Sequence, residues 1–191
     1  LQHLRPWLDG SLELAQSNVV VGLEFIRQIP TLIHVLPLDH GRDWATLGRT
    51  FIVPNSLGKP DYVGTMEFLR TSPAILRNIE AVEVRTKVVY LCLQLAEQSP
   101  EAGLALLTES PAILRALPPT EWQMKVLGYG ALLAEKHAGV TLEYLRRAPD
   151  LVGLIGPWPG SLSKFEKWFG AGMDVLAYSP EGAQAYLDRK S

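Results

Sequence analysis

The sequence has few of the features that mark secreted, membrane-spanning or nucleic-acid-binding proteins. It holds one cysteine, Cys92 in the apolar run VVYLCLQLA, and this excludes a disulfide within the chain and favours a reducing compartment, the cytoplasm. No apolar run approaches the roughly 20 residues that span a bilayer, and the N-terminal residues lack the order of a signal peptide. Lys and Arg total 18 against 20 Asp and Glu, so no net basic charge attracts a nucleic acid.

Motifs for catalysis and metal binding are also missing. The chain has no GxSxG elbow and no Walker-type glycine loop, and its single cysteine excludes zinc sites built on cysteine pairs. The one cluster worth testing is LDHGRDW at 38–44, where Asp39, His40 and Asp43 bring carboxylates and an imidazole together in sequence. This cluster directly precedes a predicted helix, where Asp is favoured as a cap. The sequence therefore predicts no catalytic residue, no metal site and no cofactor.

What the chain does have is an internal repeat. The hexapeptide SPAILR stands at 72–77 and again at 110–115, and four prolines, Pro30, Pro73, Pro111 and Pro149, are spaced 43, 38 and 38 residues apart. Each copy keeps apolar residues seven, five and four positions before the proline and two, three and six positions after it, and these offsets lie on one helical face. The positions four before the proline are Ile26, Leu69, Leu107 and Leu145, and those five before are Phe25, Phe68, Leu106 and Tyr144.

Each of these prolines is predicted to open a short helix, because proline is tolerated at the first helical position, with Ser72 and Ser110 as N-caps. A longer helix follows at 82–98, 121–137 and 162–178. The repeat unit is therefore a long, a medium and a short helix in about 40 residues. Recurring glycines in the long helices predict close backbone approach at Gly128 and Gly130, at Gly170 and Gly172, and at Gly48.

Such a period is typical of armadillo- or HEAT-like solenoids, in which stacked units supply each other's core. The fold prediction is an all-α helical-repeat solenoid of about four and a half units, forming a single domain over 1–191. Loops are expected at 54–60 and 156–160, between elements. Because the chain starts on Leu1 and ends partway through a unit, we expect it to be a piece of a longer protein. The units span roughly 6–37, 43–80, 82–118, 121–156 and 162–191.

Two rows of arginines and one tryptophan are the candidate partner-binding residues. Equivalent positions line up along the edge of a solenoid, so each row is a potential ladder for an acidic partner. A cation in the last turn of a helix is also favoured by the helix dipole, which explains the first row without a partner. Trp158, between two prolines in a loop, is a candidate anchor. The first row is Arg27, Arg70 and Arg146, three before the proline, and the second is Arg77 and Arg115, four after it.

The stretch LAEQSPEAGLALLTESPAILRALPPTEWQMKVLGYGALLAEKHAGVTLEYLRRAP resembles the helical-repeat region that precedes the von Willebrand factor A domain in NorD- and CbbO-type proteins. These are adaptor partners of MoxR-class AAA+ ATPases, which remodel or activate metalloenzymes and Rubisco. The resemblance covers roughly 15–190 and implies a cytoplasmic adaptor that couples an ATPase ring to a client enzyme. The metal-binding DxSxS motif of such A domains is absent, so the resemblance transfers no functional residue.

The sequence thus predicts a non-catalytic protein-interaction scaffold in the cytoplasm. One alternative is an enzyme or small-ligand site in the concave groove of a solenoid, which requires convergent buried polar groups. Another is a HEAT-like nucleic-acid binder, which requires Lys and Arg concentrated along one face.

Overall fold

The computed structural model is all-α, as predicted, apart from one short strand pair. The residues described are 4–54, 59–118, 120–156, 160–179, 181–182 and 185–186. The contacts cluster into two compact units, unit 1 (residues 1–111) and unit 2 (residues 112–191), and each is described by itself. In the part of the chain that is described, no helix has the length and apolarity needed to cross a membrane.

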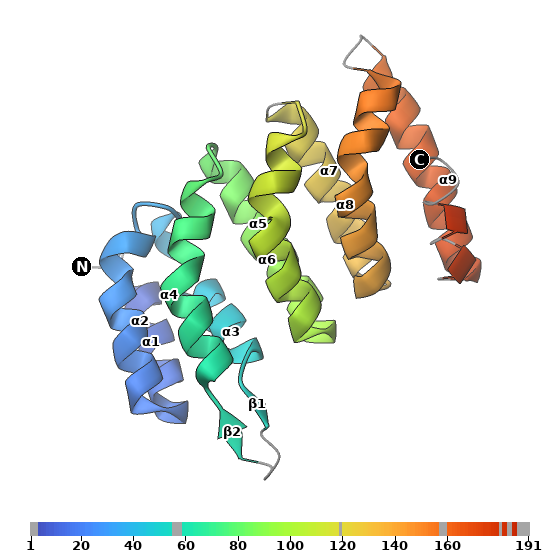
Figure 1. Ribbon diagram of the computed structural model, residues 1–191. Coiled ribbons are helices and arrows are strands. Elements are labelled where there is room, and N and C mark those ends of the chain that lie inside the picture. Colours follow the sequence, from blue (N-terminus) through green and yellow to red (C-terminus); the bar gives the residue numbers. More distant parts are fainter. Residues whose placement is uncertain are drawn as a thin grey trace. The chain divides into compact units, whose positions relative to one another are not determined.

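Unit 1 contains helical hairpins joined by short connections (Figure 1). The 3₁₀ turn η2 (Leu38–His40) precedes α3, and an antiparallel pair of strands, β1 (Val53–Pro54) and β2 (Pro60–Asp61), flanks the predicted loop at 54–60. Unit 2 begins within α6, at the end of the third copy of the repeat. The helices of unit 1 are α1 (Arg5–Ser17), α2 (Val19–Leu32), α3 (Gly41–Thr50), α4 (Val63–Arg77), α5 (Val82–Gln98) and the greater part of α6 (Pro100–Arg115), and those of unit 2 are α7 (Glu121–Ala134), α8 (Ala138–Ile155) and α9 (Ser161–Tyr178).

The four repeated prolines do not open new helices, so that prediction is wrong. Each lies inside one continuous helix. Proline within a helix removes a single amide donor and bends the helix, and burial of the side chains that follow keeps the chain on its helical path. Leu76 and Val152, three residues after their prolines, are 0% and 2% exposed. The medium and short helices of the predicted unit are therefore one helix, and each copy is a pair of helices.

The serines before two of these prolines are not N-caps. Ser72 and Ser110 are buried inside α4 and α6. The Ser110 hydroxyl donates to the carbonyl oxygen of Leu107 at 2.9 Å. In a regular helix this carbonyl would accept from the amide of residue 111, but Pro111 has no amide proton. Ser110 therefore compensates for the proline that follows it. The Ser72 hydroxyl donates to the carbonyl oxygen of Phe68, one residue before the Leu69 carbonyl that Pro73 leaves without an amide donor.

One backbone geometry recurs at helix starts, although α4, which follows Tyr62 with φ −104° and ψ 3°, lacks it. Asn18, Ser99 and His137 each precede the second helix of a pair, and Ser179 follows α9. These four residues have nearly equal dihedral angles, with φ between −162° and −151° and ψ between 107° and 124°. In each case the side chain accepts an amide hydrogen bond from the first turn, as N-caps do. The cap recurs although its residue type changes, which explains why the sequence pattern did not reveal it.

The predicted apolar positions form most of the core of each unit, but Leu23, Ile26 and Leu104 are 50%, 45% and 41% exposed, which contradicts the prediction for them. The residues five before the prolines, Phe25, Phe68, Leu106 and Tyr144, are at most 1% exposed. In unit 1, the ring of Trp7 stacks on Phe25 with centroids 6.1 Å apart, and Trp44 packs on Phe68 at 4.8 Å. Two successive copies therefore place a tryptophan of the first helix on the phenylalanine of the second.

Of the glycines predicted to allow close backbone approach, Gly48, Gly128, Gly170 and Gly172 do not show it. A Cβ atom on Gly128 or Gly170 would meet nothing within 4 Å, and one on Gly48 or Gly172 would make only ordinary side-chain contacts. A Cβ on Gly22 would lie 2.5 Å from the Ala15 Cβ, and one on Gly103 would lie 2.6 Å from the Ala96 Cβ. Both glycines stand seven residues after the alanine that they contact, across a helix–helix turn. These two pairs therefore cross tightly next to the cap, and α1 also approaches α3 closely, where a Cβ on Gly10 would lie 2.7 Å from the Ala45 Cβ.

Candidate functional site

The charged centre of unit 1 is a carboxylate held between two arginines of the first predicted row. Glu24 on α2 has a side chain only 8% exposed, and its oxygens lie 3.7 Å from Arg27 Nη1 and 3.6 Å from Arg70 Nε. Gln28 donates to Glu24 Oε1 at 3.0 Å. The hydrogen bond from Gln28, followed by the charge of Arg70 and then that of Arg27, lowers the pKa of Glu24. The carboxylate is therefore ionised at neutral pH and links α2 to α4.

An open groove borders this centre along the first turns of α4. Its volume is about 450 Å³, and Arg70 forms part of its wall. Val63, which starts α4, is 69% exposed, and the Tyr62 hydroxyl donates to the Ser17 carbonyl oxygen at 2.9 Å. The groove thus combines apolar side chains with both signs of charge, as surfaces that bind proteins do. Its lining residues are Asp61, Tyr62, Val63, Met66, Glu67, Arg70 and Thr71.

The second predicted row lies at the C-terminal ends of two helices. Arg77 is the last residue of α4 and Arg115 the last of α6, and both are exposed. Within the described residues, neither side chain makes a hydrogen bond or an ion pair. Each cation lies where the helix dipole favours it and also remains accessible to an acidic partner.

The third member of the first row repeats the pairing with a glutamate. In unit 2, Arg146 Nη1 lies 3.9 Å from Glu143 Oε2, and Arg147 Nε donates to Glu143 Oε1 at 2.9 Å. Glu143 stands six residues before Pro149, as Glu24 does before Pro30. Trp158, the last predicted binding residue, lies outside the described residues.

Sequence reasoning missed the glutamates of this pattern, although the signal was present. Glutamate stands six residues before the proline in the first, second and fourth copies, at Glu24, Glu67 and Glu143. Arginine stands three before the proline in the same three copies. The third copy has Ala105 and Thr108 at these positions and lacks both charges. The two residues therefore occur together or not at all within this chain.

A second surface feature of unit 1 is an apolar stripe on α2. Val19, Leu23 and Ile26 are 64%, 50% and 45% exposed and lie on one side of the helix, at spacings of four and three. On the preceding helix α1, Leu8 and Leu12 are 52% and 60% exposed. Exposed apolar residues gathered in this way mark interaction surfaces more often than isolated ones do.

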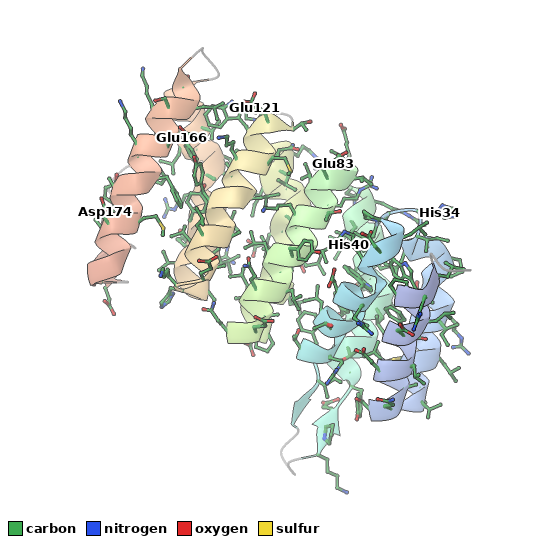
Figure 2. The ribbon with its side chains drawn as sticks, turned by 180° about the vertical axis from the view of Figure 1, so that it is seen from behind. His34, His40, Glu83, Glu121, Glu166 and Asp174 are labelled. Carbon is green, nitrogen blue, oxygen red and sulfur yellow. The ribbon has the colours of Figure 1, made fainter. Side chains whose placement is uncertain are left out.

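The histidine cluster examined from the sequence does form. His40, labelled in Figure 2, has its Nδ1 atom 3.0 Å from Asp43 Oδ2 and its Nε2 atom 3.9 Å from Asp39 Oδ1. Its ring packs edge-on against Tyr90 of α5, with centroids 5.3 Å apart. Burial, followed by the carboxylate of Asp43, raises the pKa of Tyr90. These contacts join η2 and α3 to α5, which is a structural role.

By their chemistry, the remaining histidine, cysteine and acidic side chains are candidate metal ligands or nucleophiles. Among the described residues, no group of three or more His, Cys, Asp or Glu side chains is arranged to hold a metal ion. Cys92 is fully buried, and burial raises the pKa of its thiol, so it is not a thiolate nucleophile at neutral pH.

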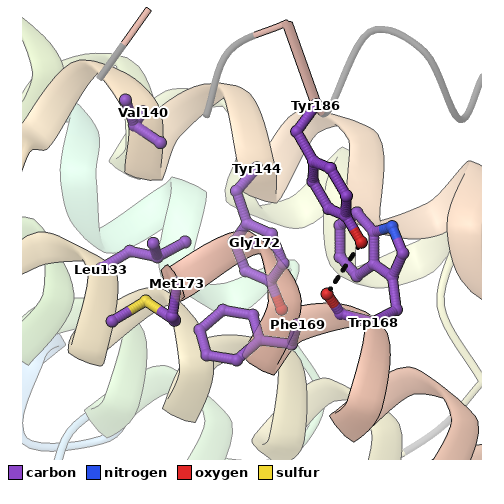
Figure 3. Close-up of a pocket in the computed structure, with 8 residues that line it drawn as sticks. All are labelled: Leu133, Val140, Tyr144, Trp168, Phe169, Gly172, Met173 and Tyr186. Carbon is purple, nitrogen blue, oxygen red and sulfur yellow. Dashed lines mark hydrogen bonds between the residues drawn. The ribbon is translucent and has the colours of Figure 1, made fainter. Parts of the chain in front are cut away.

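Unit 2 contributes an ion pair and a small aromatic cavity. Lys125 Nζ donates to Glu166 Oε1 at 3.0 Å, joining α7 to α9. The cavity is walled mainly by aromatic rings, and the Tyr186 hydroxyl donates to the Trp168 carbonyl oxygen at 3.2 Å (Figure 3). Its free space is about 20 Å³, which is room for roughly one water molecule and not for an organic ligand. The lining residues are Leu133, Val140, Tyr144, Trp168, Phe169, Gly172, Met173 and Tyr186.

Comparison with known proteins adds no relative: no family model, no curated protein and no solved structure matches the chain. The resemblance to NorD- and CbbO-type proteins therefore stays a prediction.

Proposed function

We propose that the chain is a non-catalytic protein-interaction scaffold, built as an armadillo- or HEAT-like solenoid of helix pairs. It works in the cytoplasm as the adaptor portion of an ATPase-dependent system for enzyme activation or maturation. The repeated caps at Asn18, Ser99, His137 and Ser179 support the repeat architecture, as do the two equivalent Trp–Phe pairs.

One observation carries the interaction role: an open groove of about 450 Å³ lies beside the Arg70–Glu24 ion pair. Among the described residues, no group of His, Cys, Asp and Glu side chains is arranged to hold a metal ion. The groove is open and of mixed polarity, which fits a protein segment better than a small molecule. Arg77 in unit 1 and Arg115 in unit 2 each present an exposed cation at the end of a helix. An acidic segment of a partner is the ligand that each of these cations favours.

The partner proposed from the sequence resemblance is a MoxR-class AAA+ ATPase. Binding is tested by calorimetric titration of the purified chain with the MoxR-class ATPase of the same genome. We expect the double variant Arg77→Gln/Arg115→Gln to bind about tenfold more weakly, and the weakening to be greatest at low salt, because exposed charges are screened.

The matched control is Lys164→Gln/Lys167→Gln on α9, which removes two exposed cations elsewhere and should leave the affinity unchanged. Absence of binding by the wild-type chain would contradict the adaptor role. Equal affinity of the wild-type chain and the Arg77/Arg115 variant would exclude these arginines as the contact.

A further inference from the structure

We infer that the outer face of α2, defined by Val19, Leu23, Ile26, Arg27 and Pro30, is a docking surface for an amphipathic α-helix that presents a carboxylate to Arg27. The inference rests on the proposed scaffold function and names the kind of partner that one surface binds.

The exposure of Ile26 sets the first copy of the repeat apart from the others. At the position four residues before the proline, Leu69, Leu107 and Leu145 are 0%, 1% and 0% exposed, whereas Ile26 is 45% exposed. The same repeat position, apolar in all four copies, is therefore buried in three copies and exposed in one. The surface around Ile26 is therefore equivalent to a helix-packing surface of the other copies, but no neighbouring helix covers it in the described part of unit 1.

The neighbour of the second copy is visible within unit 1. Helix α4 runs beside α2 (Figure 1), and Leu69 is completely buried. The next residue, Arg70, reaches back to Glu24 of α2 at 3.6 Å. The face of α4 that carries Leu69, Arg70 and Pro73 is thus covered by a helix that offers one carboxylate. Ile26, Arg27 and Pro30 occupy the same three positions on α2.

Arg27 is free to make the equivalent contact. Its side chain is 75% exposed, and its only ion pair in the described chain is with Glu24 on its own helix, at 3.7 Å. A guanidinium has five N–H donors in a planar fork, so it can bind a second carboxylate from the solvent side. The partner helix that fits therefore has an apolar side for Leu23 and Ile26 and a glutamate or aspartate level with Arg27. This is the helix-in-groove mode of recognition.

A direct probe is available from the chain itself. A hydrocarbon-stapled peptide of residues 18–33 carries Glu24 on the side that α4 covers in the intact molecule. Fluorescence anisotropy of the labelled peptide, titrated with the full chain, measures its dissociation constant. We expect saturable binding that weakens at least tenfold for Arg27→Gln, at least tenfold for Leu23→Ser/Ile26→Ser, and about tenfold when the peptide carries Glu24→Gln.

The control protein is Leu132→Ser. Leu132 lies on α7 in unit 2, and its exposed fraction of 47% is nearly the same as the 45% of Ile26. It should bind the peptide like the wild type. Leu23→Ser/Ile26→Ser should melt somewhat earlier than the wild type, because Ile26 is only 45% exposed, and binding is therefore measured well below the melting temperature of every variant. If the double variant is not fully folded at that temperature, it is replaced by Leu23→Gln alone, which keeps the side-chain volume.

Four results would overturn the inference. The first is absence of saturable binding, and the second is a loss of binding with Arg70→Gln but not with Arg27→Gln, which would mean that the peptide had displaced α2 from α4. The third is self-association of the chain by analytical ultracentrifugation that Leu23→Ser/Ile26→Ser abolishes, which would make a second copy the occupant. The fourth is binding to anionic phospholipid vesicles through the same residues without peptide binding, which would make a membrane the occupant.

The outcome is separable from that of the ATPase titration. Peptide binding without ATPase binding would contradict the adaptor role alone, and ATPase binding without peptide binding would contradict only the role of the outer face of α2.

Discussion

Truncating the side chain four residues before the proline should destabilise the second copy of the repeat more than the first. Leu69 is 0% exposed and Ile26 is 45% exposed, and both lie in unit 1. The substitutions Leu69→Ala and Ile26→Ala therefore compare one repeat position in its covered and uncovered forms, within one compact unit.

The expected costs follow from burial. Leu→Ala in a core lowers the free energy of unfolding by about 2–5 kcal/mol, through lost transfer energy and the cavity left behind. Ile26→Ala removes three carbon atoms, worth about 2.4 kcal/mol at about 0.8 kcal/mol for each buried methylene. With 45% of the side chain already exposed, roughly 1.3 kcal/mol of this remains. The better helix propensity of alanine returns a few tenths, so the net cost is about 1 kcal/mol.

Urea unfolding followed by circular dichroism at 222 nm and by tryptophan fluorescence measures both costs, with fits that allow a separate transition for each unit. Leu107→Ala and Leu145→Ala should also cost about 2–5 kcal/mol, since these leucines are 1% and 0% exposed. A loss for Ile26→Ala as large as that for Leu69→Ala would refute the reasoning, because it would show that the outer face of α2 is already covered. An unfolding transition for Leu69→Ala that equals that of the wild type would contradict the alignment of the repeat copies by their prolines.

Three further predictions concern glycine, serine and glutamate. Gly22→Ala should lower the free energy of unfolding by about 1–3 kcal/mol, because the added Cβ would lie 2.5 Å from the Ala15 Cβ. Gly128→Ala should raise the free energy of unfolding by about 0.5–1 kcal/mol, because the added Cβ would meet nothing within 4 Å. A change of the same sign for both variants in urea titrations would contradict the assigned helix crossings. Ser110→Ala should lower the free energy of unfolding by about 1–3 kcal/mol, because it leaves the Leu107 carbonyl without a donor. The control is Thr108→Ala, which removes an exposed hydroxyl that donates to the Leu104 carbonyl oxygen and should change the free energy of unfolding by less than about 0.5 kcal/mol. Glu24→Gln should lower the urea midpoint at neutral pH. The difference from wild type should shrink as the pH falls through the lowered pKa of Glu24, because a carboxyl group with a lowered pKa stabilises the fold only while it is ionised. A difference that stays constant down to acid pH would exclude the ion pairs as its cause.

The helices and the core were accessible from the sequence because apolar periodicity reports burial directly. The pattern before the prolines predicted the buried positions Phe25, Phe68, Leu106 and Tyr144, and the long helix expected at 82–98 is α5 with the same bounds. The path of the chain at the prolines was not accessible. Local preference favours a helix start there, but the Ser110 hydroxyl and the buried leucines that follow make a continuous helix the better solution.

The candidate site was accessible only in part. The arginine rows were visible as repeated positions, but their ion-pair partners depend on which helices lie side by side, and Arg70 reaches a glutamate 46 positions earlier in the chain. The exposure of Ile26 was hidden for a related reason. A repeat pattern shows that equivalent residues are apolar and does not show which copy has a neighbour on that side.

The carboxylate between two arginines has a consequence for the evolution of the chain. Arg70 and Glu24 are partners across two helices, so loss of either leaves the other poorly compensated. In an alignment of orthologues, these two positions should covary. Arg27 faces solvent, and its substitutions should instead track changes in whatever helix docks against it.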